Sequence, residues 1–348
     1  MQRKHLIIAG AVAVVIVGGT FWLRLRGPSA EPTLEKISLR LQWIPQAQFA
    51  GYIVAERLGY YRQQGLQVEI RPAGPDLKPQ MTVAAGTDDI AVGVSNQVIS
   101  GRSNGVPLKI IAQLFQDSAN RYVLKGKNAI RSLKELRGKK IGLWLGGDEA
   151  EFVAMLRTVG MELKDVDVVP QGFTIIPFLQ DQYVLSQVTV YNELIQIQDA
   201  GYGGDKLQIV PPDEYKAAIV SDMLFTTEKF IKEHKSATQR FLTASLLGWK
   251  YCFENPEKAV DIVVAHNPEL KKDEQQKQLR AVLGLIWKGQ AVTKGLGYMD
   301  IEFYSTAERV LFESGQIRSH VKPNDVFDES LWTTVPDASK RISGTARF

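Results

Sequence analysis

Short apolar runs alternate with helix-like periodicities over the first two thirds of the chain. Runs typical of strands occupy residues 38–43, 66–70, 89–94, 108–114, 140–145, 166–170, 188–191 and 207–210. Apolar positions at helical spacing fall between them, at residues 50–61, 97–101, 149–159 and 193–200. Because strands that alternate with helices form βαβ units, this pattern predicts an α/β fold with largely parallel sheets.

From about residue 228 onward the pattern is helical only. Apolar stripes mark residues 236–253, 258–266, 272–288 and 300–314, and packing against a core explains such stripes. The roughly 318 residues that follow the N-terminal segment exceed a comfortable single domain and favour two.

The N-terminal segment is predicted to span a membrane. Residues 6–23 contain Thr20 as their only polar side chain, and basic residues flank both ends. Eighteen residues of helix cover roughly 27 Å, about the thickness of a bilayer core. Residues 28–30 match a cleavage site poorly, so residues 1–30 are interpreted as an uncleaved anchor with a linker, with a cleaved signal segment as the alternative. The remainder is then periplasmic or otherwise extracytoplasmic, tethered to the inner membrane.

Charge and cysteine content exclude several classes of function. The formal net charge is +4, and the first 30 residues carry four basic and no acidic side chains, so the remainder is formally neutral. A neutral body is not expected to bind nucleic acid. Cys252 is the only cysteine, which excludes an intramolecular disulfide and a thiolate metal cluster.

The chain offers little catalytic chemistry. None of its four histidines has metal-ligand spacing, and the sequence contains no G-x-S-x-G, Walker or G-x-G-x-x-G motif. We therefore expect no catalytic residues, no metal and no cofactor. Asp148 and Glu151 have the spacing of a helix capping box.

Aromatic, amide and carboxylate side chains recur instead where predicted strands lead into helices. The predicted ligand-binding residues are Trp43, Gln46, Gln48, Phe49, Asn96, Trp144, Asp148, Glu149, Tyr191, Asn192 and Glu193. In open α/β sheets, ligands bind beyond the carboxyl ends of the strands. Aromatic rings stack on planar ligands, while amides and carboxylates bind polar ring edges. Trp43 as a core residue and Glu193 as a helix cap remain alternatives.

This set favours a small planar heteroaromatic ligand that is neutral or weakly cationic. A sulfonate, nitrate or phosphate site would need more Arg or Lys at these positions.

The same residues carry a resemblance to a known family. Residues 39–70 (LRLQWIPQAQFAGYIVAERLGYYRQQGLQVEI), 82–93 (TVAAGTDDIAVG), 132–152 (SLKELRGKKIGLWLGGDEAEF), 188–194 (VTVYNEL) and 248–260 (GWKYCFENPEKAV) occur in the family's order. Over roughly residues 36–330 the chain resembles the substrate-binding proteins of ABC importers that are related to thiamine-pyrimidine synthase and to sulfonate, taurine and nitrate binders.

The resemblance implies a type II periplasmic-binding-protein fold with two lobes that close like a hinged clamp. Lobe one would comprise residues 36–118 and 225–335, and lobe two residues 119–224, with crossovers near residues 116–122 and 221–227. Trp43 would stack on the ligand, Gln46 and Gln48 would hydrogen-bond to it, and Tyr191, Asn192 and Glu193 would complete the cleft.

The resemblance also implies partners. A monomer would deliver a thiamine pyrimidine precursor to an ABC permease, with a riboflavin-type or sulfonate-type ligand as alternatives. A sensor that reports the ligand to a membrane partner is a further alternative.

The enzyme branch of the family synthesises the pyrimidine. It uses a histidine that residues 92–97 lack and a Cys-rich motif that a single cysteine cannot supply. We therefore expect a binding protein and not an enzyme, with a pyrimidine-synthesising enzyme of the same family as the alternative. Residues 182–186 (QYVLS) also depart from the family's Gly-x-Val-Asp-Ala.

Overall fold

The computed structural model describes residues 33–342. The chain from Glu35 onward forms one compact unit. The predicted membrane anchor at residues 1–30 lies outside the described residues. No helix within residues 33–342 is long and apolar enough to span a bilayer.

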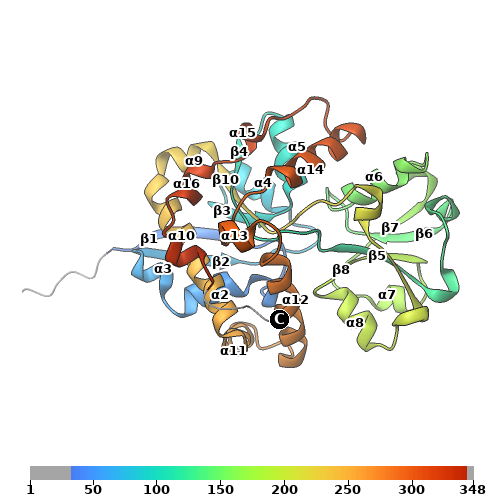
Figure 1. Ribbon diagram of the computed structural model, residues 1–348, viewed down its shortest axis with the longest axis horizontal. Coiled ribbons are helices and arrows are strands. Elements are labelled where there is room, and N and C mark those ends of the chain that lie inside the picture. Colours follow the sequence, from blue (N-terminus) through green and yellow to red (C-terminus); the bar gives the residue numbers. More distant parts are fainter. Residues whose placement is uncertain (1–32, 343–348) are drawn as a thin grey trace, which may run out of the picture. The chain divides into compact units, whose positions relative to one another are not determined.

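Two five-stranded sheets form the framework of this unit (Figure 1). The first contains β1 (Glu35–Arg40), β2 (Leu66–Arg71), β3 (Ile90–Gly93), β4 (Leu108–Gln113) and β10 (Met223–Thr227), in the order β2-β1-β3-β10-β4. The second contains β5 (Asn120–Lys125), β6 (Lys140–Leu143), β7 (Asp167–Pro170), β8 (Leu185–Thr189) and β9 (Leu207–Val210), in the order β7-β6-β8-β5-β9. This is the predicted two-lobe α/β architecture.

Both sheets are mixed rather than largely parallel. β10 runs antiparallel to β3 and β4, and β5 runs antiparallel to β8 and β9. Each of these two strands enters a sheet directly after the chain has left the other sheet, with no α-helix between. Only the 3-10 helix η6 (Pro212–Tyr215) lies between β9 and β10. The predicted crossovers at residues 116–122 and 221–227 overlap both strands, so neither strand nor its antiparallel pairing was predicted. The exact lobe boundaries stay predictions.

Helices flank each sheet (Figure 1). Around the second sheet lie α6 (Ala150–Thr158), α7 (Ile176–Leu179) and α8 (Glu193–Asp199). The first sheet carries α2 (Ala50–Arg57), α3 (Tyr60–Gln63), α4 (Pro79–Ala84), α5 (Ser95–Ser103), α9 (Glu228–Glu233), α10 (Lys235–Glu254), α11 (Pro256–His266), α12 (Lys272–Ile286), α13 (Ala291–Lys294), α14 (Ile301–Glu313), α15 (Pro323–Val326), α16 (Glu329–Thr333) and α17 (Asp337–Lys340). The late helical segment of the sequence therefore returns to the first sheet.

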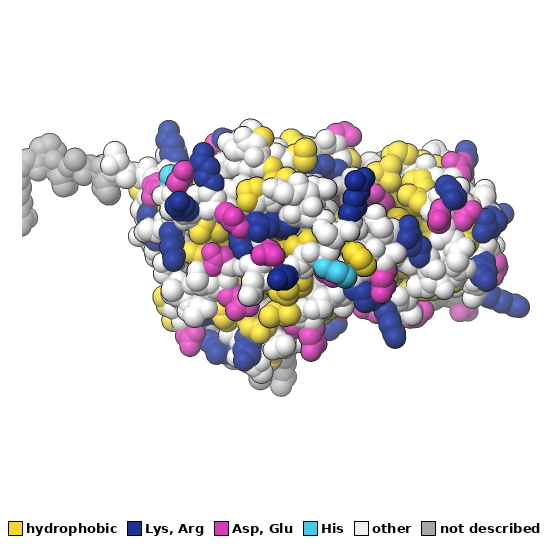
Figure 2. Space-filling view, turned by 90° about the horizontal axis from the view of Figure 1, so that it is seen from above, with side chains coloured by type: hydrophobic (Ala, Val, Ile, Leu, Met, Phe, Trp, Pro, Cys, Tyr) yellow, Lys and Arg dark blue, Asp and Glu magenta, His cyan; other side chains and the backbone are white. Residues whose placement is uncertain are grey.

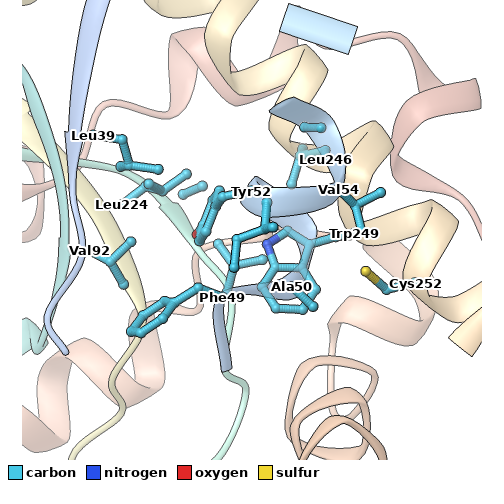
Figure 3. Close-up of a cluster of buried hydrophobic side chains, with 14 of the residues drawn as sticks. Leu39, Phe49, Ala50, Tyr52, Val54, Val92, Leu224, Leu246, Trp249 and Cys252 are labelled. Carbon is cyan, nitrogen blue, oxygen red and sulfur yellow. The ribbon is translucent and has the colours of Figure 1, made fainter. Parts of the chain in front are cut away.

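Two glycines let α2 and α10 approach each other closely. A Cβ atom at Gly248 would lie 1.9 Å from the carbonyl oxygen of Gly51, and one at Gly51 would lie 2.3 Å from the Trp249 ring. The Trp249 indole fills the space over Gly51 and meets the Tyr52 ring edge-on, with ring centroids 5.7 Å apart (Figure 3). This contact forms the centre of the larger core, which fixes the segment before α2.

A buried carboxylate ties the two crossovers together. Glu151, at 1% exposure, accepts hydrogen bonds from Ser118 Oγ and Asn120 Nδ2 (both 2.8 Å) on the outward crossover. On the return crossover, Ile219 N donates to the same carboxylate at 2.5 Å. The predicted capping box of Asp148 and Glu151 is therefore wrong, because the Glu151 side chain turns inward to these buried donors.

Positive and negative side chains are interspersed over the face seen in Figure 2. This agrees with the formal neutrality of residues 31–348.

Candidate functional site

A pocket of about 100 Å³ lies where elements of the two sheets meet. Eight of the predicted ligand residues line it: Trp43, Gln46, Gln48, Trp144, Asp148, Tyr191, Asn192 and Glu193. They come from three separate junctions that the fold brings together. Their contacts with a ligand stay predictions.

The other three predicted residues do not line the pocket. Phe49 is fully buried in the core beside α2 (Figure 3). Asn96 Nδ2 donates to the carbonyl oxygen of Gly147 (2.6 Å), and Glu149 Oε2 accepts from the Gly147 amide (2.8 Å). Asn96 and Glu149 thus support the loop between β6 and α6 from outside the pocket wall.

Glutamines of α12 hold the first junction in place. The short 3-10 helix η1 (Ala47–Phe49) precedes α2, and its free amides need acceptors. Gln275 Oε1 accepts from the Ala47 amide (2.7 Å) and Gln278 Oε1 from the Gln48 amide (3.3 Å). Gln46 Nε2 in turn donates to Gln48 Oε1 at 3.0 Å. The C-terminal helices therefore fix the side chains that sequence reasoning assigned to the ligand.

A carboxylate lies behind this wall of the pocket. Asp222, at 1% exposure, accepts from Gln42 Nε2 at 2.8 Å and from Gln48 Nε2 at 3.1 Å. Ser221 Oγ donates to it at 3.2 Å. Burial disfavours the charged form and raises the pKa of Asp222 to about 7, against the opposing effect of these hydrogen bonds.

Aromatic rings from both lobes contact one another beside the pocket. The rings of Trp43 and Trp144 meet edge-to-face, with centroids 6.1 Å apart. Phe173, which is more than half exposed, lies 4.8 Å from Trp43 between centroids. A Cβ atom at Gly74 would lie 2.6 Å from the Phe173 ring, so only glycine admits this approach. Trp43 therefore bridges the first lobe to two aromatic rings of the second.

The loop between β6 and α6 contributes a carboxylate. Gly146 and Gly147 both have positive φ, at +92° and +117°, which bends the loop toward the first lobe. Asp148 Oδ2 accepts from Lys78 Nζ at 3.2 Å, and Asp148 Oδ1 accepts from Gln97 Nε2 at 3.3 Å. Surrounding protein raises the pKa of the Asp148 carboxyl by desolvation, while Lys78 acts in the opposite direction.

The junction after β8 supplies the second carboxylate. Glu193 Oε2 accepts from the amide and the hydroxyl of Thr189, at 3.0 and 2.6 Å, and Asn192 Nδ2 donates to Glu193 Oε1 at 2.6 Å. Burial raises the pKa of Glu193. Glu193 is thus the first residue of α8 and part of the pocket wall, while Asn192 occupies the N-cap position and no side chain of the described residues caps the helix.

Sequence reasoning missed several residues of the pocket wall. They include Gln42, Lys78, Asn120, Gln187 and Ser221. Asn120 and Ser221 fall within the ranges that the sequence analysis assigned to crossovers. Those two could have been proposed, because crossovers of a two-lobe protein border its cleft. Nothing in the sequence singles out Lys78.

Unused hydrogen-bond capacity in the pocket includes several acceptors. No described residue donates to Gln42 Oε1 or Asn120 Oδ1, and the carboxylates of Asp148 and Glu193 keep lone pairs for further donors. Lys78 is the only cation that lines the pocket within residues 33–342, and its Nζ already donates to Leu145 O (2.6 Å) and Asp148. The wall therefore suits a ligand that donates hydrogen bonds.

Within the part of the chain that the structure describes, no three His, Cys, Asp or Glu side chains are grouped to hold a metal ion.

Comparison with known proteins identifies relatives. Residues 46–259 match the profile of the family described as NMT1/THI5 like. The riboflavin-binding protein RibY of Chloroflexus aurantiacus is 26% identical over 86% of this chain and 87% of that protein. The formylaminopyrimidine-binding protein of Halalkalibacterium halodurans is 23% identical over 69% of this chain and 73% of that protein.

Solved structures show the same fold. The periplasmic aliphatic sulphonate-binding protein SsuA of Escherichia coli superimposes with a TM-score of 0.60 at 11% identity, over 90% of this chain and 95% of that chain. At this identity the likeness establishes the periplasmic-binding-protein fold and nothing about the ligand.

The expectation that the chain is not an enzyme has to be corrected. The 4-amino-5-hydroxymethyl-2-methylpyrimidine phosphate synthase THI11 of Saccharomyces cerevisiae is 22% identical over 70% of this chain and 75% of that protein. A synthase of the same description from Legionella pneumophila is 23% identical over 70% of this chain. The relatives therefore include enzymes as well as binding proteins. The missing histidine at residues 92–97 and the missing Cys-rich motif do not by themselves exclude an enzyme.

Proposed function

The match over residues 46–259 covers more than half of the chain, so the chain belongs to the NMT1/THI5-like family, and we propose that it captures a small planar heteroaromatic ligand rich in N–H donors. A pyrimidine precursor of thiamine is the ligand class that fits best. The protein delivers this ligand to the permease of an ABC importer.

The free acceptors of the pocket are the observation that carries this proposal. Gln42, Asn120, Asp148 and Glu193 line the pocket, and their two amide oxygens and two carboxylates keep free lone pairs. An amino-substituted ring supplies matching N–H groups, and protonation of the ring adds a charge that the carboxylates favour. A sulfonate presents only acceptors, and it would meet these oxygens without a free cation.

Aromatic surface in the pocket supports a planar ring. The pocket volume of about 100 Å³ is several times what one water molecule needs, roughly 10–15 Å³. Trp43 and Trp144 offer the ring aromatic surface.

Riboflavin is the second candidate, and the relative RibY favours it because the similarity spans 86% of this chain. A flavin also presents a planar ring with an N–H donor, so the aromatic and acceptor side chains of the pocket suit it as well.

Location and partner follow from the same proposal. The relatives with this fold include periplasmic binding proteins, and an extracytoplasmic body tethered by residues 1–30 would meet a permease at the membrane surface.

A ligand screen tests the proposal. The full-length chain in mild detergent is melted alone and with 4-amino-5-hydroxymethyl-2-methylpyrimidine, riboflavin or taurine, each at about one hundred times the expected Kd. Binding at that excess stabilises the folded state by about 2.7 kcal/mol, which raises Tm by several degrees. We expect this shift with the aminopyrimidine. A shift with riboflavin alone supports the second candidate, and a shift with taurine alone contradicts both.

A further inference from the structure

Asp222 occupies an unusual place behind the pocket wall. It directly precedes β10, is 1% exposed, and does not line the pocket itself. Its φ of +55° lies in the left-handed region, which Asp and Asn tolerate better than other non-glycine residues. The backbone therefore places a carboxylate at a point where few residue types fit.

An ionised carboxylate accepts hydrogen bonds and donates none, so it decides how neighbouring amides are oriented. Gln42 Nε2 and Gln48 Nε2 both point to Asp222, at 2.8 and 3.1 Å. The amide oxygens of both glutamines must then point away from Asp222.

The two glutamines differ in what their oxygens meet. Gln48 Oε1 accepts from Gln46 Nε2 at 3.0 Å, and Gln278 Nε2 donates to Gln46 Oε1 at 3.3 Å, so a chain of amides locks Gln48. Gln42 Oε1 has no donor among the described residues, and Gln42 lines the pocket. Gln42 alone can therefore turn its amide without breaking a protein hydrogen bond other than the one to Asp222.

We propose that Asp222 is a positioning residue that sets the ligand specificity of the pocket by holding Gln42 with its amide oxygen toward the ligand. At that point of the ring the site selects an amino group over a carbonyl oxygen. This inference rests on the proposed function, because it needs a heteroaromatic ligand in the pocket.

Replacement of Asp222 by asparagine changes which groups donate and accept at this position, while asparagine tolerates the same backbone conformation. Gln42 Nε2 and Gln48 Nε2 both donate to Asp222 Oδ2, and Gln48 Nε2 also lies 3.3 Å from Oδ1. In Asp222→Asn, an oxygen at the Oδ1 position keeps the bond from Gln48, whose own oxygen is held by Gln46, and the new NH2 group takes the Oδ2 position next to Gln42. The new amide nitrogen then donates to Gln42 Oε1, and Gln42 turns its NH2 group to the pocket. The site now offers a donor and suits a ring carbonyl.

A matched ligand pair tests the inference. Isothermal titration of the full-length chain gives Kd for 4-amino-2-methylpyrimidine and for 2-methylpyrimidin-4-one. We expect wild type to favour the amino compound at least tenfold. In Asp222→Asn this preference falls at least tenfold, with tighter binding of the oxo compound. A loss of binding from general damage would weaken both ligands and leave their ratio unchanged, and that result would overturn the inference.

Two further variants keep the test decisive. Glu257→Gln neutralises an exposed carboxyl that does not line the pocket, and it should leave the amino-to-oxo ratio unchanged. If Asp222→Asn does not fold, Gln42→Met removes the oriented amide itself and should abolish the preference. Retention of the preference in Gln42→Met also overturns the inference. If wild type binds neither pyrimidine, the proposed function fails and the inference fails with it. An unchanged ratio in a variant that still binds refutes the inference alone.

Discussion

Glu151 and Asp222 are carboxyl groups buried where the chain passes between its two sheets. Desolvation raises the pKa of each to about 7, although hydrogen bonds to their charged forms act in the opposite direction. Each carboxyl organises polar groups from distant parts of the chain: Glu151 joins the two crossovers, and Asp222 orients two glutamines. Such groups stabilise one arrangement of the chain at a cost in desolvation.

Glu151 should therefore make stability depend on pH. Its pKa is about 7 in the folded chain and about 4.3 in an unfolded one. The folded state binds the proton more tightly, so this stabilising contribution is full below about pH 4 and is lost as pH rises through 7. Urea unfolding should show that the advantage of wild type over Glu151→Gln shrinks by about 2–3 kcal/mol between pH 5 and pH 8.

The surface variant Glu257→Gln serves as the control, since Glu257 is exposed. Its difference from wild type should stay constant over this range. A constant difference for Glu151→Gln as well would contradict the account of the buried carboxyl.

At the scale of single residues, the sequence predicted which residue types form the site better than it predicted which individual residues line the pocket. Eight of the eleven predicted residues line the pocket, because the junctions after β1, β6 and β8 come together where elements of the two sheets meet. Phe49 belongs to the same run as Trp43, yet it begins the buried side of η1 and α2. Asp222 was not predicted, since its partners Gln42 and Gln48 are about 175–180 positions away in the sequence.

Between elements, the contact of α2 with α10 depends on glycine. Alanine normally stabilises a helix by about 1 kcal/mol relative to glycine. At Gly248, however, a Cβ atom would lie 1.9 Å from the carbonyl oxygen of Gly51, so the two helices must move apart. We expect Gly248→Ala to lower the free energy of unfolding by about 1–3 kcal/mol, as overpacking does, when measured by urea denaturation.

Gly284 of α12 provides the matched control, because no atom lies within 4 Å of its added Cβ position. Gly284→Ala should raise stability by roughly 0.5–1 kcal/mol. If both alanine variants stabilise the protein, the close approach of α2 and α10 is not a constraint.

Strands that follow helices were predictable, whereas strands that follow crossovers were not. β2, β4 and β9 lie within two residues of their predicted ranges. β5 starts with Asn120 and Arg121, and this polar start hides its apolar continuation. β10 has only five residues and sits in the middle of its sheet. Neighbours from distant parts of the sequence stabilise both strands, and local patterns carry no information about them.

Across the whole unit, direct hydrogen bonds join the two lobes beside the pocket. Lys78 Nζ reaches the Leu145 carbonyl oxygen at 2.6 Å, and Asn96 Nδ2 reaches Gly147 O at 2.6 Å. These bonds would retain a ligand between the lobes. Since charges of both signs are interspersed (Figure 2) and the body is formally neutral, ligand selection depends on these local contacts rather than on a long-range field.

Asn96→Ala tests retention by the lobes, because Asn96 does not line the pocket. The variant loses the bond to Gly147, so bound aminopyrimidine should leave several-fold faster with little change in association rate. Stopped-flow competition measures both rates. Asn104→Ala, at an exposed position that caps the C-terminus of the same helix, should leave them unchanged. An unchanged dissociation rate in Asn96→Ala would show that this bond does not retain the ligand.

The central claim is that the pocket recognises a heteroaromatic ring by the hydrogen bonds that the ring donates. Calorimetric titration of the full-length chain with 4-amino-2-methylpyrimidine and its 4-dimethylamino analogue tests it most directly, because methylation removes the donors and keeps the ring. A site whose buried polar groups are left unpaired rejects such an analogue strongly. We predict that dimethylation weakens binding at least one hundredfold. Equal affinity for the two compounds would contradict the account.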